Sequence, residues 1–390
     1  MRRLLSVGSL CLLVVGCYAP EASEEATSEN RVLGRFEVAV LDVGQGSAAV
    51  VAAPGGCVAL LDGGPEGSGA VIKRYLRSLG VTEIAFAVAS HYHEDHIGGL
   101  DEVEQGADGI RIRTVYDRGG TFQGAAFGRY YRQFADRRAT VHAGQTLSLC
   151  GEVALEVEAV DAGGRETSDE NARSVVVAAR WRAIDVLAGG DLPGAPGTLN
   201  MEAQLAPALG PVEAYLVHHH GSRSSSSAEL LRAITPQVSI ISVGADNTYN
   251  HPAPETLARL REAASDVWQT EDPATQTRGG HVRLASLDGT SFTVAQGERR
   301  TAYRARDDGG ACATAITYRA YFNASRTLRL YATSTRSPDA ALSVSADGVA
   351  LGAMTWSAAN SRYELVQSLA ARPRCVTVHP DCGEAVTRCY

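Results

Sequence analysis

The chain has 390 residues, 45% of them hydrophobic, and a formal net charge of −8. That length and apolar content suit a large globular domain together with a smaller one. The negative charge, with Lys73 as the single lysine, excludes the broad basic surface by which proteins usually hold a nucleic-acid backbone. Any polyanionic substrate is therefore expected to be held locally, by the site itself.

The N-terminal segment MRRLLSVGSLCLLVVGC predicts an export signal, because two arginines precede an apolar run that is too short to span a bilayer. Its last four letters resemble the lipobox of bacterial lipoproteins, which implies that residues 1–17 are a signal peptide and that Cys17 carries a lipid anchor. Residues 18–33 include the acidic run EASEEATSEN and are expected to form a tether. We expect an extracytoplasmic lipoprotein anchored to a membrane; the alternative is ordinary cleavage and a secreted protein.

Strands and helices alternate between residues 34 and 298, which we expect to form one domain. Helical spacing marks GAVIKRYLRSLG and PETLARLREAAS. Strands interleaved with helices, together with hairpin pairs, predict an α/β sandwich with mixed sheets. The strands predicted from apolar and β-branched runs are 36–53 (two strands around a glycine turn), 57–64, 83–90, 147–160, 174–181, 183–191, 214–220 and 238–244.

The C-terminal part of the chain shows a different pattern. Segments such as AITYRAYF and TLRLYATS alternate at period two with no helical pattern between them. This predicts a small all-β domain, a β-sandwich, over residues 311–390. The segment RRTAYRARDDGG, residues 299–310, is expected to be the linker between the two domains.

Six cysteines follow the predicted signal, an even number that favours disulfides in an oxidising compartment. No C-x2-C pair occurs among them, so a zinc ribbon is not favoured. The domain layout pairs Cys57 with Cys150 and leaves four cysteines for the C-terminal domain, namely Cys312, Cys375, Cys382 and Cys389.

The segment ASHYHEDHIGGL, residues 89–100, places three histidines and two acids in six consecutive positions after an apolar run. Alternate residues of an extended segment point the same way, so His91 and His93 can face one point in space. Beyond them the chain must turn, and Asp95 with His96 can face a neighbouring point. Imidazole and carboxylate together suit zinc, manganese or iron. Two such sites about 3.5–4 Å apart would polarise a substrate oxygen and supply a hydroxide.

The pattern H-x-H-x-D-H after an apolar strand resembles the signature of the metallo-β-lactamase superfamily. The flanking sequence resembles its DVGQG branch, which includes the ComEC-like metal-hydrolase domain, and the likeness runs over residues 36–297. It implies a four-layer αββα fold and a hydrolase with two divalent metal ions, zinc first, with manganese or iron as alternatives. The matching segments, in order, are LDVGQGS, LLDGG, HYHEDHIGG, NARSVVV, GGD, HHGS and SVGADNTYNHP.

The resemblance also implies roles for individual residues. His91 and His93 would bind the first metal, Asp95, His96 and His220 the second, and Asp191 would bridge the two. Asp95, His219 and His251 would take part in catalysis, with His219 in the acid role facing the substrate. We expect His218 to be a bystander in the strand. Three histidines match no position of the family and are expected to be surface or core residues: His142, His281 and His379.

Two positions depart from the family pattern. Ser47 stands where the branch usually has an aspartate, and a lost carboxylate near the site could alter the hydrogen bonding of the ligands. Asn171 stands in the region where many members supply a further histidine for the first metal. The number of bound metals, one or two, is therefore left open.

Together these features predict a metal-dependent hydrolase of phosphodiesters, a nuclease or phosphodiesterase, that uses a metal-bound hydroxide. Its expected partners are a phosphate-ester substrate, including nucleic acid, and a membrane through the lipid anchor. The tract SRSSSS offers Arg223 and hydroxyl groups to a phosphate, or is a solvated loop. One alternative is a hydrolase of carboxylic esters, lactones or β-lactams. The other is a non-catalytic surface binding protein.

Overall fold

The computed structural model describes residues 34–195, 197–306, 316–323, 326–334, 342–357, 360, 362–380 and 386–389. The predicted signal peptide and tether lie outside the described residues, as do Cys312 and Cys382. Among the helices that are described, none has the length and apolar content needed to cross a membrane.

The first sheet has nine strands in the order β20-β19-β18-β1-β2-β3-β5-β7-β8. Pairing is antiparallel from β20 to β3 and parallel from β3 to β8. The strands are β1 Phe36–Val40, β2 Ala49–Ala52, β3 Val58–Leu61, β5 Phe86–Val88, β7 Val115–Asp117, β8 Arg138–Thr140, β18 Val282–Ser286, β19 Ser291–Gln296 and β20 Arg299–Arg304.

The second sheet has seven strands in the order β15-β14-β13-β12-β11-β10-β9. Here β9 to β12 pair antiparallel, and β12 to β15 pair parallel. The strands are β9 Thr146–Leu149, β10 Val153–Ala159, β11 Val176–Trp181, β12 Ile184–Ala188, β13 Ala214–Leu216, β14 Val238–Ile241 and β15 Asp266–Gln269.

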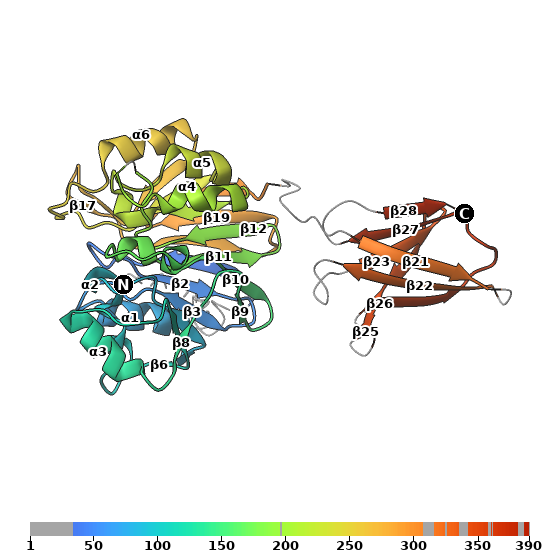
Figure 1. Ribbon diagram of the computed structural model, residues 1–390, viewed down its shortest axis with the longest axis horizontal. Helices are drawn as coiled ribbons and strands as arrows, with labels where there is room; N and C mark the ends of the chain where they lie inside the picture. The colour runs from blue at the N-terminus through green and yellow to red at the C-terminus, as the bar shows by residue number, and fades with distance from the viewer. Residues whose placement is uncertain are drawn as a thin grey trace, which may run out of the picture.

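Three apolar clusters hold these layers together, and β1 shows how. Its sequence FEVAV is buried on both faces: Val38 and Val40 join the cluster between the two sheets, and Ala39 joins the cluster under the helices. Helices α1 Gly69–Ser78 and α3 Ala125–Phe134 cover the outer face of the first sheet. The outer face of the second sheet is covered by α4 Met201–Leu205, α5 Ala228–Ile234 and α6 Pro254–Glu262. The predicted four-layer αββα sandwich is confirmed (Figure 1).

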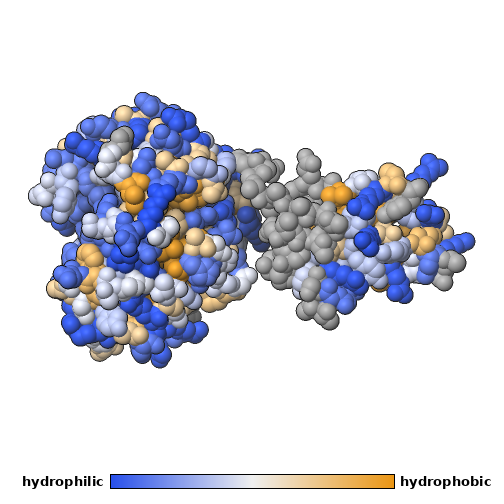
Figure 2. All heavy atoms as spheres, viewed as in Figure 1, coloured by the Kyte–Doolittle hydropathy of each residue, from blue (hydrophilic) through white to orange (hydrophobic). Residues whose placement is uncertain are grey.

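Short elements connect the layers. The helix α2 spans Glu94–Ile97, and two small ladders pair β4 Glu83–Ile84 with β6 Arg111–Ile112 and β16 Glu271–Asp272 with β17 Thr277–Arg278. The 3₁₀ turns are η2 Asp101–Val103, η3 Asp161–Gly164, η4 Asn171–Arg173, η5 Ala206–Ala208 and η6 His218–Gly221. The visible surface is mostly hydrophilic, and apolar residues gather chiefly where the two halves of the sandwich meet (Figure 2).

The C-terminal strands form two antiparallel four-stranded sheets, β21-β22-β26-β25 and β24-β23-β27-β28. They share an apolar cluster that includes Leu330, Val344 and Val376, so the expected all-β architecture is confirmed. The strands are β21 Ile316–Phe322, β22 Thr327–Ser334, β23 Leu342–Ala346, β24 Val349–Ala353, β25 Thr355–Ser357, β26 Arg362–Ser368, β27 Cys375–Pro380 and β28 Val386–Cys389.

The predicted linker over residues 299–310 is wrong in its first part. Residues 299–304 form β20, which pairs with β19 along its whole length and extends the nine-stranded sheet. The ring of Tyr303 stacks on Phe292 at a centroid distance of 5.0 Å, so an aromatic side chain helps to hold this segment on the sheet.

Two disulfides lie within the described residues. The structure pairs Cys57 with Cys150, as predicted, and Cys375 with Cys389. Cys57 follows β2, and Cys150 follows β9, so the first bridge joins a hairpin of one sheet to a hairpin of the other. A hydrogen bond from Gly55 N to Glu152 Oε2, 2.9 Å long, links the same two hairpins.

Candidate metal centre

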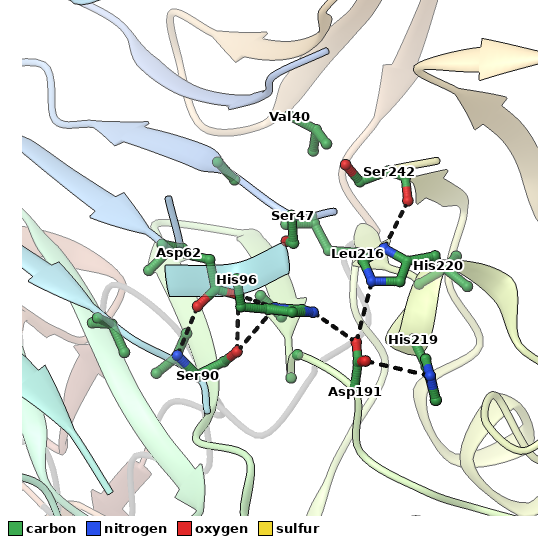
Figure 3. A pocket seen from close by; sticks show the side chains of 18 of the residues that line it. Val40, Ser47, Asp62, Ser90, His96, Asp191, Leu216, His219, His220 and Ser242 are labelled. Atoms are coloured by element: carbon green, nitrogen blue, oxygen red, sulfur yellow. Dashed lines mark hydrogen bonds and ion pairs between the residues drawn. The ribbon is translucent and has the colours of Figure 1, made fainter. Parts of the chain in front are cut away.

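The candidate centre lies where strands of the two sheets end close together. The segment that carries the H-x-H-x-D-H pattern follows β5 of the first sheet. Asp191 follows β12, and His220 follows β13, which are neighbours in the second sheet. Figure 3 shows His96, His219 and His220 directed toward the carboxylate of Asp191. The fold therefore brings together ligand candidates that lie more than a hundred residues apart in the sequence.

These side chains form two groups of candidate ligand atoms, and within each group all the atoms lie within 4.8 Å of one another. In the larger group, His96 Nε2 lies 3.0 Å from Asp191 Oδ1, and His220 Nε2 lies 3.2 Å from Asp95 Oδ2. In the smaller group, His91 Nε2 lies 3.1 Å from His93 Nδ1 and 3.9 Å from Asp191 Oδ2. Asp191 belongs to both groups and offers one oxygen to each.

Several of these atoms are buried without a hydrogen bond. Among the described residues, His96 Nε2, His220 Nε2 and Asp191 Oδ1 have no hydrogen-bond partner of acceptable geometry, although His96 and Asp191 form a close ion pair. Leaving a buried polar group unsatisfied costs about 1–3 kcal/mol, more if it is charged. A divalent cation among these imidazoles and carboxylates would satisfy all three atoms, and the donor set is one that zinc, manganese and iron accept. The residues present fit such ions.

The orientation of His96 is fixed by Asp62, a residue to which the sequence analysis gave no role. His96 Nδ1 lies 2.7 Å from Asp62 Oδ2, and Asp62 also accepts hydrogen bonds from the backbone N and the Oγ of Ser90. A carboxylate on the far nitrogen of a ligand histidine sets its tautomer and directs the other nitrogen toward the metal. The available signal was an aspartate at the end of a buried strand within a matched segment, LLDGG. His220 is held in the same way, with its Nδ1 3.0 Å from the carbonyl oxygen of Ser242.

The turn that carries the second-sheet histidines has strained backbone. His219 and His220 have φ of 55° and 53°, in the left-handed region that non-glycine residues rarely adopt. Such residues cost of order 1–3 kcal/mol each and cluster at functional sites. The prediction of one strand over residues 214–220 is therefore wrong beyond Leu216, because η6 turns these imidazoles toward the first sheet.

Charge and burial oppose each other in the cluster. Burial lowers the pKa of His91 well below its usual value. Burial also works to lower the pKa of His96, but the carboxylates of Asp191 and Asp62 outweigh it and raise that pKa well above its usual value. For Asp191, burial favours the neutral acid, yet the surrounding imidazoles, His96 foremost, hold its pKa well below the usual range. Without a metal, the cluster therefore holds a charged Asp191 carboxylate, a neutral His91 and a protonated His96, and a metal ion that binds His96 would displace that proton.

The family model described as metallo-beta-lactamase superfamily matches residues 41–245, just over half of the chain. The chain belongs to the metallo-β-lactamase superfamily. With the candidate ligands in place, this identifies it as a metal-dependent hydrolase of the metallo-β-lactamase fold. The expected resemblance to the competence-protein branch is also confirmed, by relatives that include the two below.

Two curated relatives of this superfamily member are much longer proteins. This chain is 27% identical over 240 residues to Recombination protein 2 of Haemophilus influenzae, and the match covers 60% of this chain and 28% of the relative. It is 25% identical over 250 residues to Competence protein ComA of Neisseria gonorrhoeae, covering 63% of this chain and 32% of the relative. The chain thus spans about a third or less of the length of either relative.

Two solved structures are more distantly similar to this chain. The metallo-beta-lactamase fold protein YhfI from Bacillus subtilis has a TM-score of 0.39 and 11% identity, over 60% of this chain and 95% of that one. A diphosphatase from the PhnP family has a TM-score of 0.38 and 15% identity, over 61% of this chain and 95% of that one.

The histidines outside the two ligand groups fall into two sets, those near the cluster and those with no role predicted for them. His219 Nε2 lies 3.4 Å from Asp191 Oδ2, and the ring of His251 lies 5.4 Å from that of His219, so the structure brings both predicted catalytic histidines to the cluster. Burial and the charges of His219 and His220 lower the pKa of His251 to about 4. The other four lie outside the ligand groups of the described residues: His142, His218, His281 and His379.

His218 begins η6 rather than lying in the strand, and it belongs to neither ligand group of the described residues. Its Nδ1 lies 2.7 Å from Glu202 Oε1 in a fully buried pair. Glu202 also accepts hydrogen bonds from the backbone nitrogens of Ser226 and Ser227. This pair anchors the turn whose next two residues enter the cluster.

The structure shows what the serine tract SRSSSS contacts. Ser226 Oγ bonds to Tyr215 Oη, and Ser227 caps α5. Both serines are buried, so they fit neither the solvated loop nor the phosphate contact that the sequence left open. Arg223 is exposed.

The two departures from the family pattern also lie at defined places. Ser47 lines the same pocket as His96 and Asp191, and its backbone N donates a hydrogen bond of 3.0 Å to the carbonyl oxygen of Asp95. Among the described residues, the buried Oδ1 of Asn171 has no partner.

Proposed function

We propose that this hydrolase cleaves phosphodiesters with two divalent metal ions, zinc in the first place, bound by the two ligand groups. The observation that carries the proposal is the sharing of Asp191 between the groups, which suits a bridged pair of ions. Paired divalent ions at such a site polarise a phosphoryl oxygen and lower the pKa of water. The recombination and competence names of the two relatives favour a nucleic-acid phosphodiester over a carboxylic ester.

In this proposal the chain's own residues divide the work. His91 and His93 hold one ion, Asp95, His96 and His220 hold the other, and Asp191 holds both. With a metal ion at Nε2 of His96, Asp62 would accept the proton that remains on Nδ1.

His219 and Arg223 are proposed to face the substrate. The side chain of His219 is 24% exposed whereas that of His220 is 3% exposed, which supports His220 as the ligand and His219 as the substrate-side group. Because burial lowers the pKa of His219, we assign it as a neutral imidazole that donates an N–H to a phosphoryl or leaving-group oxygen. The exposed guanidinium of Arg223, four residues further on, is suited to a second phosphoryl oxygen.

The test of this function is a substrate panel with purified, metal-loaded protein. We expect hydrolysis of bis-p-nitrophenyl phosphate, and little or none of lactones or β-lactams. His219→Ala should keep the bound metal and lower turnover by about 10²-fold, as expected for loss of a positioned proton donor. His142→Ala, at an exposed position, should change neither. Cleavage of lactones or β-lactams without any phosphodiester cleavage contradicts the substrate class and leaves the fold unaffected.

Export and lipid anchoring complete the proposal. The N-terminal sequence pattern supports a lipid on Cys17, and the two disulfides support an oxidising compartment. Cys17→Ser should move the protein from the detergent phase to the aqueous phase in a detergent partition, or block its maturation. Cys11→Ser is the matched control and should partition like the wild type. Unchanged partition of Cys17→Ser, together with wild-type removal of the signal peptide, rules out the anchor.

A further inference from the structure

An exposed aromatic ring stands beside the metal centre. Tyr249, in the loop between β14 and α6, is 67% exposed. Its ring stacks on His251 with a centroid distance of 5.7 Å and an interplanar angle of 26°. His251 in turn lies 5.4 Å from the ring of His219, next to the ligand groups. A series of rings therefore leads from the solvent to the candidate centre.

The loop under this ring is held firmly in place by one side chain. Asn247 Oδ1 accepts the backbone N of Tyr249 at 3.2 Å and that of His251 at 3.0 Å. Its Nδ2 donates to the carbonyls of Gly244 and His251 at 2.7 and 2.8 Å. The loop is also tied to η6 by a hydrogen bond from Ala253 N to Gly221 O of 2.8 Å. The position of Tyr249 is thus set before any ligand binds.

The fold itself makes little use of the Tyr249 side chain. Among the described residues its hydroxyl has no hydrogen-bond partner, and its ring contacts that of His251. A large apolar ring that is left exposed on a fixed loop at the edge of a site is suited to a flat ligand, because little conformational entropy is lost when the ligand binds.

We propose that Tyr249 is a stacking platform for a nucleobase, so that the substrate is a phosphodiester with an unpaired base next to the scissile phosphate. This deepens, and rests on, the proposed phosphodiester hydrolysis. Every base has a π face, so one tyrosine can accept any of them, whereas a base inside a duplex is already stacked and paired. His251 and His219 connect Tyr249 to the ligand groups through ring contacts, so a nucleotide that stacks on Tyr249 can extend its phosphate toward the centre.

The first test measures stacking without hydrolysis. A trinucleotide with phosphorothioate linkages and a central 2-aminopurine loses fluorescence when that base stacks on an aromatic ring. We expect the full-length, metal-loaded wild type to quench it, Tyr249→Phe to quench it equally, and Tyr249→Ala to leave the fluorescence nearly unchanged. Absence of quenching by the wild type, or equal quenching by Tyr249→Ala, overturns the platform.

The second test compares two substrates with one leaving group, the p-nitrophenyl ester of thymidine 5′-phosphate and ethyl p-nitrophenyl phosphate. Tyr249→Ala should raise KM for the nucleotide about tenfold or more, the expected worth of one stacked base. Any change in kcat that follows from the lost contact with His251 should be the same for both substrates. KM for the ethyl ester should not move. Tyr249→Phe should match the wild type, as should Tyr321→Ala, which removes a 52% exposed tyrosine of β21.

The outcomes separate this inference from the proposed function. An equal rise of KM for both esters makes Tyr249 a general structural residue of the site and contradicts the platform. If the wild type cleaves neither ester, phosphodiester hydrolysis fails, and the fluorescence test still decides whether a base stacks on Tyr249.

Discussion

Replacing Asp191 by alanine should remove both metal ions, whereas Asp95→Ala should remove one. Asp191 is 2% exposed and belongs to both ligand groups, while Asp95 belongs to one of them. Hydrolysis by Asp191→Ala should fall by more than about 100-fold, since loss of a residue that only supports a ligand already costs 10–100-fold. Metal per chain is measured by mass spectrometry of the desalted protein, and rates with bis-p-nitrophenyl phosphate.

The metal content of Asp191→Ala relative to that of Asp95→Ala tests whether Asp191 bridges two ions. Asp136→Ala removes a carboxylate that is 84% exposed, and this control should keep wild-type metal and rate. If Asp191→Ala and Asp95→Ala lose the same amount of metal, Asp191 does not bridge two sites. If Asp191→Ala keeps wild-type metal and rate, the cluster is not the active site.

Glu202→Ala should destabilise the αββα part by roughly 3–5 kcal/mol, the range for breaking a buried charged pair. Glu202 is fully buried and accepts three hydrogen bonds, from His218 Nδ1 at 2.7 Å, Ser226 N at 2.7 Å and Ser227 N at 2.6 Å. Alanine leaves three buried donors without an acceptor, and water cannot replace the carboxylate without opening the packed turn. The measurement is the urea midpoint followed by near-ultraviolet circular dichroism.

Two variants control for this prediction. Glu166→Ala removes an exposed glutamate and should change stability by less than about 0.5 kcal/mol. Glu202→Gln keeps the shape but turns one acceptor into a donor, so its loss of stability should fall between the other two. An unchanged urea midpoint for Glu202→Ala means that the His218–Glu202 pair does not anchor η6.

Local patterns were enough to predict the strands whose two faces are both apolar and the helix that ends in glycine. They did not predict α3, because AAFGRYYRQF contains a glycine and two tyrosines and has weak helical propensity. They merged β4 and β5 into one strand, although β4 pairs with β6 in a separate ladder. Both features depend on the partner that the segment meets in the fold.

The same distinction holds at the site. The spacing of His91, His93, Asp95 and His96 is local and was visible in the sequence. The contact of Asp62 with His96 joins residues 34 positions apart, and that of Glu202 with His218 joins residues 16 positions apart. Neither contact has a spacing rule, because each joins two elements that meet only in the folded protein. The left-handed backbone of His219 and His220 was missed for a related reason, since an apolar run gives no sign that the next residues must turn.

The disulfide between Cys57 and Cys150, which are 93 positions apart in the sequence, closes residues 57–150 of the αββα part into a covalent ring. That ring contains the whole H-x-H-x-D-H segment. A protease that cuts the exposed stretch around Gly106 therefore opens the ring without releasing a fragment. The two pieces remain one molecule on a non-reducing gel and separate only after reduction. In a compartment rich in proteases, a nicked enzyme of this kind keeps its first-sheet ligands bound to the rest of the chain.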